Sequence, residues 1–496
     1  MRTAGVLLPV FSLPGKYGIG TFGKEAYWFA DQLAAAGQHY WQILPLGPTS
    51  YGDSPYQSFS TFAGNPYFID LEAFPEEILP KKKLRSYEFG ADPTRIDYGR
   101  LYDGRLKLLY EAYQVDNYLG LEKNYPDFTA FCQENASWLE DYALFMALKE
   151  QHDGAPWYTW EEPLKNHDEA ALAPLRSSLG DRTRFHCWLQ YQFKKQWTKL
   201  KAYVNGLGIE LIGDIPIYVA LDSSDVWSAP KLFQMDEERR PVWVAGVPPD
   251  GFCATGQLWG NPVYDWDYHR KTGYAWWMKR IQAMFELVDV LRIDHFRGFD
   301  AYYCVPAADE TAENGHWENG PGIEFFQMIR EKLGERRIIA EDLGFLTERV
   351  IKLVKDTGYP GMKILEFAFD SREESDYLPH RWPKNCVAYT GTHDNQTFRA
   401  WFHELPRADK KFALDYMNLD GRAEESWNEY AIRMAFASAA DTVIIPLQDW
   451  CGLGSEARIN QPSTLGGNWQ WRMEKKNFDK KLAAKMLHVT KLYGRA

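Results

Sequence analysis

Residues Val288–Gly298 read VDVLRIDHFRG, and this stretch decides the fold. Its apolar residues Val288, Val290, Leu291 and Ile293 are typical of a buried strand, and ionisable residues follow directly. Because Arg292 and Asp294 are two positions apart, a strand places both side chains on one face. A guanidinium beside Asp294 is expected to lower the pKa of the carboxyl and to keep it ionised.

Seven other segments have the same character, with an apolar run that ends in polar or turn residues. The eight predicted strands are Gly5–Phe11, His39–Leu46, Ile209–Val219, Val288–Asp294, Arg336–Asp342, Gly361–Phe369, Cys386–Asp394 and Asp441–Asp449. Most are apolar throughout, as in parallel strands covered on both faces. Helical patterns such as Gly23–Gly37 and Leu346–Gly358 stand between them. This alternation predicts an α/β fold, a (β/α)8 TIM barrel.

The uneven spacing of the strands predicts large insertions. Residues 75–200 carry a helical periodicity, so we expect a mainly helical insertion there. Residues 221–267 are rich in Pro, Gly and Trp and are expected to form a loop insertion that acts as a substrate lid. No linker separates these stretches, so residues 1–496 are expected to form a single catalytic barrel without a separate C-terminal β-sandwich domain.

Composition excludes several classes of function. The net charge of −12 argues against nucleic acid and anionic membranes as partners. No run of 18 apolar residues suggests a membrane span, and the first residues do not form a secretion signal. The six cysteines are scattered, which is typical of reduced thiols and not of a disulfide framework or a zinc site. A cytoplasmic protein is expected.

Four of the predicted strands end in an acid: Asp214, Asp294, Glu341 and Asp394. Active sites of such barrels lie at the carboxyl ends of the strands, so these acids are expected to converge. Two or three carboxylates without a His/Cys cluster suit glycosidic chemistry, in which one carboxylate attacks the anomeric carbon and another protonates the leaving oxygen. Neither a metal nor another cofactor is expected.

Several longer motifs resemble one known family. They are GDSPYQS (52–58), TGQLWGNP (255–262), LRIDHFRGF (291–299), AEDLG (340–344) and YTGTHDNQT (389–397). These are similar to the 4-α-glucanotransferases, called amylomaltases or disproportionating enzymes, which form glycoside hydrolase family 77 of the α-amylase clan. The likeness runs from Leu13–Gly23 to Ala457–Thr464 and so covers nearly the whole chain.

The resemblance implies roles for individual residues. Asp294 would be the nucleophile, Glu341 the general acid/base and Asp394 the stabiliser of the transition state. Residues implied to bind substrate are Tyr56, Asp214, Arg292, His295 and His393, with Gln257 and Trp259 in the lid, and with Asp370 and Asn460. His295 and His393 are expected to bond sugar hydroxyls and not a metal.

The implied activity is that of a retaining 4-α-glucanotransferase. It would disproportionate maltooligosaccharides and amylose through a covalent glycosyl–enzyme intermediate, with a glucan or glucose as acceptor. The same carboxylates would equally serve an α-1,4-glucan hydrolase, and the aromatic content of 16% also fits an inactive glucan-binding protein. A monomer or weak homo-oligomer is expected.

Overall fold

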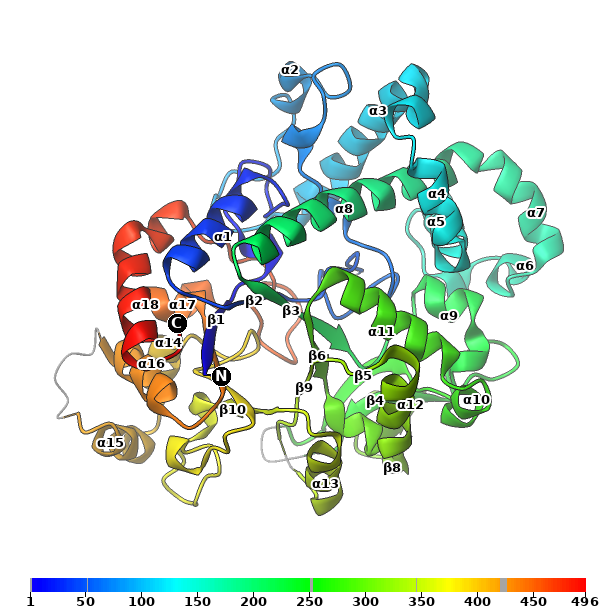
Figure 1. The fold of residues 1–496 in the computed structure, drawn as a ribbon. Helices are drawn as coiled ribbons and strands as arrows, with labels where there is room; N and C mark the ends of the chain where they lie inside the picture. The colour runs from blue at the N-terminus through cyan, green and yellow to red at the C-terminus, as the bar shows by residue number, and fades with distance from the viewer. Residues whose placement is uncertain (1, 51, 250–252, 345, 420–425) are drawn as a thin grey trace.

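Eight parallel strands form a nearly closed barrel in the computed structural model, which describes residues 2–50, 52–249, 253–344, 346–419 and 426–496 (Figure 1). The barrel strands are β1 (Thr3–Leu7), β2 (Tyr40–Gln42), β3 (Glu210–Pro216), β6 (Val290–Asp294), β9 (Ile338–Ala340), β10 (Gly361–Ile364), β11 (Cys386–Tyr389) and β12 (Thr442–Pro446). Each lies inside one of the eight predicted segments. The predicted barrel is confirmed.

The strands follow one another around the barrel in chain order, from β1 to β12 and back to β1. Only β9 and β10 lack a ladder, and there the amide of Ala340 still donates to the carbonyl of Pro360 at 2.9 Å. Between β3 and β6 the register pairs Asp214 with Arg292 and Pro216 with Asp294. This register brings the acids of two predicted strands to the same end of the barrel.

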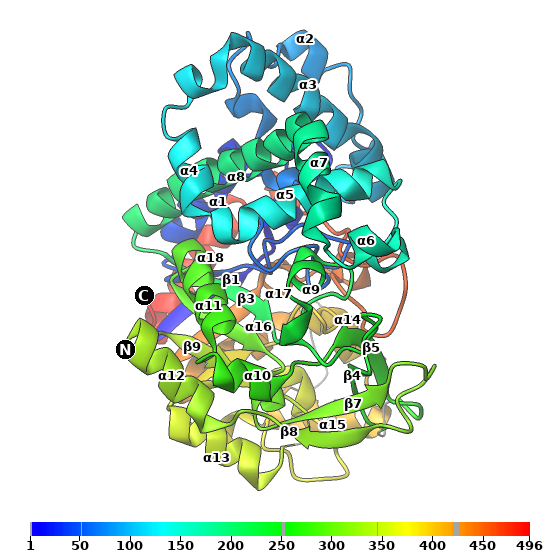
Figure 2. The ribbon, with the colours of Figure 1, turned by 90° about the vertical axis from the view of Figure 1, so that its right-hand side faces the viewer.

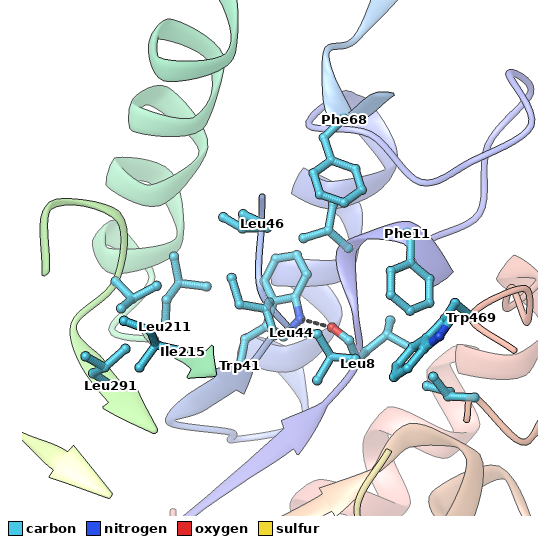
Figure 3. Packing of buried hydrophobic residues seen from close by; sticks show 14 of the residues in the cluster. Leu8, Phe11, Trp41, Leu44, Leu46, Phe68, Leu211, Ile215, Leu291 and Trp469 are labelled. Atoms are coloured by element: carbon cyan, nitrogen blue, oxygen red, sulfur yellow. Dashed lines mark hydrogen bonds between the residues drawn. The ribbon is translucent and has the colours of Figure 1, made fainter. Parts of the chain in front are cut away.

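Alternation along the strands separates two apolar cores. Ile212 and Val290 point into the barrel with Tyr40 and Ile339, and the polar residues Asp214, Arg292 and Asp294 follow them on the same face. Leu211, Leu291 and Trp41 point outward into the core shared with the helices (Figure 3). There the indole Nε1 of Trp41 donates to the carbonyl of Leu8 at 2.8 Å, so this buried donor has a partner.

Helices cover the outside of the barrel. The helices that stand between the barrel strands or after the last one include α1 (Lys24–Ala35), α11 (Ala275–Leu287), α12 (Ile323–Leu333), α13 (Glu348–Thr357), α14 (Phe398–Glu404), α15 (Arg407–Tyr416), α16 (Trp427–Ala437), α17 (Leu447–Cys451) and α18 (Lys480–Leu492). After β12 the described residues contain helices, turns and an isolated bridge, and no further sheet. Arg495, close to the end of the chain, donates to the carbonyls of Thr3 and Asp441 and so ties the C-terminus to β1.

Between β2 and β3 the chain is mainly helical and lies on one side of the barrel (Figures 1 and 2). Its helices are α2 (Lys81–Leu84), α3 (Tyr98–Asn124), α4 (Phe128–Glu134), α5 (Ala136–Gln151), α6 (Glu162–Lys165), α7 (Glu169–Ser178) and α8 (Gly180–Gly206). The long helix α8 packs against α5 and then leads directly into β3. None of the helices in the described ranges has the length and apolar character needed to cross a bilayer.

A second, antiparallel sheet stands beside the barrel and was not predicted. Its strands, in the order β5-β4-β7-β8, are Gln257–Pro262, Trp243–Val247, Ala301–Pro306 and His316–Asn319 (Figure 2). Two of them lie within residues 221–267, so that stretch is not a loop throughout; it also holds α9 (Ser224–Ser228) and the first two residues of α10 (Trp266–Lys271). Strands β4 and β5 are short and contain Gly and Trp, and β4 pairs with β7 farther along the chain. Their sequences therefore show no clear alternation of apolar and polar residues. Residues 250–252 of this stretch lie outside the described ranges.

Candidate active site

Arg292 lies at the centre of a buried ion network at the carboxyl ends of β3 and β6. Its Nη1 is 2.8 and 2.7 Å from the two carboxylate oxygens of Asp214 and 2.9 Å from Oδ1 of Asp294. Arg292 and Asp214 are 3% and 1% exposed, so their charges depend on each other for solvation. The prediction that Arg292 and Asp294 share a face is confirmed.

Burial dominates the pKa of Asp294. It raises that pKa from its ordinary value of 3.8 to about 7; the Arg292 guanidinium opposes the rise, and the neighbouring acids add to it. The prediction that Arg292 leaves this carboxyl with a lowered pKa is therefore wrong. The guanidinium acts in the expected direction, but Asp214 shares its charge, and the loss of water around Asp294 outweighs it.

Glu341 follows β9 and is held next to Asp294. The backbone amide of His295 donates to Oε2 of Glu341 at 2.6 Å, and the amide of Leu343 donates to Oε1 at 2.9 Å. Burial raises the pKa of this carboxyl, although Arg292 and the two amide donors oppose the rise. A carboxyl in such surroundings retains a proton to higher pH than a solvated one, as a general acid requires.

Asp394 has the opposite electrostatic character. Burial alone would raise the pKa of this carboxyl, but the charge and hydrogen bond of His393 and the amide of Asn460 lower it to about 2. His393 Nε2 lies 3.3 Å from Oδ2, and Asn460 Nδ2 donates to Oδ1 at 2.6 Å. Asp394 is therefore a permanent anion across the physiological range of pH.

Aromatic rings form one wall of the site. The ring of Tyr56 stacks on that of His393 with centroids 5.1 Å apart, and Trp469 packs against both. The hydroxyl of Tyr56 donates to Oδ2 of Asp214 at 2.7 Å, which orients the carboxylate that holds Arg292. The wall thus joins segments that are more than 400 residues apart in the sequence.

Strand β5 carries a second wall. The ring of Trp259 meets the ring of His295 nearly at a right angle, with centroids 4.8 Å apart. Its Nε1 donates to Oε1 of Gln257 at 3.2 Å. His295 has a left-handed backbone with φ of 51°, and burial lowers the pKa of its ring to about 3, so the imidazole is neutral.

A cleft of about 800 Å³ opens between these walls. Asp294, His295 and Asp394 line it together with the predicted Tyr56, Gln257, Trp259 and Asn460. Further residues that line it were not predicted, among them Ser54, Gln57, Tyr218, Asn261, Pro462 and Trp469. Gln57 lies in the GDSPYQS motif and Asn261 in the TGQLWGNP motif, so the sequence motifs could have indicated that both residues line the site. Trp469 offered none.

Asp370 is the one predicted site residue that the structure does not bring into this network. Its carboxylate binds the Arg372 side chain at 2.6 Å and the Arg372 backbone amide at 2.9 Å. This exposed contact holds the pKa of Asp370 down at about 2. β10 ends at Ile364, and the chain turns through a 3₁₀ segment (Leu365–Phe367) before Asp370, so the residue lies beyond the strand end.

Within the described ranges, no three or more His, Cys, Asp or Glu side chains are arranged to hold a metal ion. The histidines of the site are engaged otherwise, since His393 binds Asp394 and His295 packs on Trp259. What the cleft does offer is two carboxyl groups, Asp294 and Asp394, between polar and aromatic walls, with the carboxyl group of Glu341 held beside Asp294 by the His295 amide. This arrangement suits a sugar and acid/base chemistry at its anomeric carbon.

Comparison with known proteins gives the family. Residues 8–477 match the model of glycoside hydrolase family 77, described as 4-α-glucanotransferase. The chain belongs to the 4-α-glucanotransferase family. The predicted membership and enzymatic activity are thereby confirmed, and nothing favours a hydrolase or an inactive binding protein.

Relatives of this 4-α-glucanotransferase match it along its whole length. It is 49% identical to a 4-α-glucanotransferase of Clostridium butyricum, with 98% of this chain and 99% of the relative covered. A Streptococcus pneumoniae 4-α-glucanotransferase is 47% identical over 100% of this chain and 97% of its own. The amylomaltase of Streptococcus agalactiae, solved in complex with acarbose, superposes with a TM-score of 0.96 at 43% identity, and both chains are fully covered.

Proposed function

We propose that this 4-α-glucanotransferase works by a double displacement on maltodextrins, with Asp294 as nucleophile. Asp294 attacks the anomeric carbon of an α-1,4-linked glucose, and Glu341 gives its proton to the departing 4-oxygen. A second glucan then enters, Glu341 takes the proton from its 4-hydroxyl, and that oxygen displaces Asp294. Two inversions at one carbon retain the α configuration. The observation that carries this proposal is the placement of Asp294 and Glu341 at the carboxyl ends of the neighbouring strands β6 and β9, with the amide of His295 bonded to Glu341.

The electrostatics of Asp394 and Glu341 fit this division of labour. Asp394 stays ionised because His393 and Asn460 hold its pKa near 2, so its charge can face the oxocarbenium-like transition state. Glu341 keeps a raised pKa, as an acid catalyst needs. When a glycosyl group is attached to Asp294, the charge of that carboxylate is lost. Glu341 then loses a negative neighbour, and its pKa falls toward that of a base.

Substrate is held by groups already in position. Arg292, Asp214, Tyr56 and His393 are assigned to the sugar on the non-reducing side of the cleaved bond, where their bonds to one another fix their geometry. The neutral ring of His295 can donate to or accept from a sugar hydroxyl. No direct substrate contact is assigned to Asp370, because it is bound to Arg372 outside this network.

The acceptor side is assigned to Gln257 and Trp259 on β5. We propose that residues 221–267 act as a lid, because β5 places these side chains across the cleft from Tyr56. A lid that limits water at the intermediate favours transfer over hydrolysis. The Streptococcus agalactiae relative was solved in complex with acarbose, which supports an oligosaccharide ligand for this protein. Maltooligosaccharides and amylose are the proposed donors, glucose is a proposed acceptor, and the cytoplasm is the proposed location.

Incubation with maltotriose alone tests this function. Transfer keeps the number of reducing ends constant and yields glucose together with chains longer than maltotriose. Hydrolysis raises the number of reducing ends and yields only shorter products. A steady rise in reducing ends without longer chains would contradict the proposal, and so would recovery of unchanged maltotriose.

A further inference from the structure

Strand β5 presents three alternate side chains to the cleft, and the third is tethered. Gln257, Trp259 and Asn261 are two positions apart, so they share one face of the strand, and all three line the cleft. Asn261 is only 5% exposed. Its side chain, near the end of β5, is therefore placed to anchor the strand by hydrogen bonds within the protein.

Asn261 bonds to the opposite side of the cleft through a reciprocal amide pair. Gln57 Nε2 donates to Asn261 Oδ1 at 3.1 Å, and Asn261 Nδ2 lies 3.4 Å from Gln57 Oε1. Asn261 Nδ2 also donates to the carbonyl of Val219, just beyond β3, at 2.8 Å. Gln57 directly follows Tyr56, whose hydroxyl binds Asp214. The amide pair therefore connects β5 to the aromatic wall that contains Tyr56.

The backbone of β5 needs such a tether. The ladder between β4 and β5 changes register between Val244 and Gly246, so it does not fix the strand by regular pairing. Gly260, between Trp259 and Asn261, has φ of 74°, a conformation in which glycine is freer than other residues. A shift of Asn261 would therefore be passed to Trp259, whose ring rests on His295 beside Asp294.

We propose that Gln57 and Asn261 are positioning residues whose amide pair sets the partition of the glycosyl group between a sugar acceptor and water. The proposal rests on the function proposed above. The pair keeps Trp259 and Gln257 at a fixed distance from the nucleophile. An acceptor sugar then fits beside the glycosyl group, and water has less access to it. Loss of the pair leaves the carboxyl groups in place but loosens the acceptor side.

A double-mutant cycle tests the pair. Gln57→Ala, Asn261→Ala and the double variant are compared by the ratio of hydrolysis to transfer on maltotriose and by KM for glucose as acceptor. Gln57→Ala is expected to raise the ratio about fivefold, the effect of one net hydrogen bond. Asn261→Ala, which also loses the bond to the Val219 carbonyl, should raise the ratio at least as much, and the double variant should raise it no further than Asn261→Ala does. Additive changes would mean that the amides act separately and would overturn the proposal. An unchanged ratio would overturn it too.

Gln196 provides a matched control. Its side-chain amide makes two hydrogen bonds with the backbone of Asp70, which lies on the same β2–β3 connection as Gln57. It accepts from the Asp70 amide at 2.7 Å and donates to the Asp70 carbonyl at 3.3 Å. Gln196→Ala is expected to lower the melting temperature without changing the ratio. An equal change of ratio in this variant would show that general loosening is responsible, and the proposal would be wrong.

A swap of the two side chains gives a second, independent result. Gln57→Asn combined with Asn261→Gln keeps the summed length of the pair, so the ratio is expected to return toward that of the unmodified enzyme. A swap variant that folds and keeps the raised ratio would contradict the role of the paired amides. If the unmodified enzyme gives no transfer at all, the proposed function fails; if it transfers normally and the variants do too, only the positioning role fails.

Discussion

Arg292 lies between Asp214 and Asp294, with one nitrogen 2.7 Å from an oxygen of the first and 2.9 Å from an oxygen of the second. The nucleophile therefore receives only a share of the guanidinium charge, and burial raises its pKa to about 7. The pKa of Asp294 therefore depends on how strongly Arg292 interacts with Asp294 and how strongly it interacts with Asp214.

Removal of that charge should move the pH profile. In Arg292→Gln the pKa of Asp294 is expected to rise above about 7, because burial and the neighbouring acids act without opposition. The nucleophile must be ionised, so kcat/KM should rise with pH in both enzymes, but at a higher pH in the variant. Arg292→Lys, which keeps the charge, should shift this rise of kcat/KM with pH much less. A rise that stays in place in Arg292→Gln would rule out the electrostatic role.

Asp294→Asn should abolish transfer and stabilise the fold. Loss of a nucleophile costs several orders of magnitude in rate. The folded-state pKa of Asp294 is raised from 3.8 to about 7, so the native protein loses stability as the pH rises through that window, when this partly buried carboxyl must ionise. Asparagine does not ionise.

The melting temperature of Asp294→Asn should therefore exceed that of the unmodified enzyme by a margin that grows between pH 4 and about 7. Thermal unfolding over this range measures the margin. A constant margin, or one that shrinks with pH, would show that burial does not raise the pKa of this carboxyl.

Asn460→Asp should damage the site through Asp394. Asn460 donates to Asp394 at 2.6 Å, and a carboxylate at that position would repel the anion instead. We expect kcat/KM to fall on the order of 100-fold, comparable to the loss of one donor to a catalytic charge. Gln461→Glu, which adds the same charge at the exposed neighbouring residue, should leave kcat/KM nearly unchanged. Equal losses in both variants would point to a general charge effect.

The barrel could be predicted because its strands are covered on both faces. Segments such as Val288–Asp294 are apolar almost throughout, and that pattern survives without knowledge of any partner strand. Their ends were harder to place: Gly361–Phe369 was predicted as one strand, but β10 stops at Ile364. The chain has to leave the barrel edge there, and the apolar residues Leu365 and Phe367 continue in a 3₁₀ turn.

The site could be predicted only in part, for a similar reason. The acids at strand ends were visible, and spacing alone placed Arg292 beside Asp294. The contact between Arg292 and Asp214 depends on the register of β3 and β6, which no local pattern specifies. The link from Asn460 to Asp394 joins two loops 66 residues apart, so only the family resemblance pointed to it. The Gln57–Asn261 pair spans 204 residues.

The most direct test of the central claim is to trap the intermediate on Asp294. Glu341→Gln keeps the shape of the acid/base but cannot donate or accept the proton. An α-glucosyl fluoride needs no protonation of its leaving group, so it should still glycosylate Asp294. Release to a sugar hydroxyl should be slow, because no base remains.

Mass spectrometry of the intact variant should then show the added mass of one glucosyl unit, and peptide mapping should place it on Asp294. Azide, a nucleophile that needs no base, should speed its release. An adduct on any other residue, or no adduct while the fluoride is consumed, would contradict the assignment of Asp294 as the nucleophile.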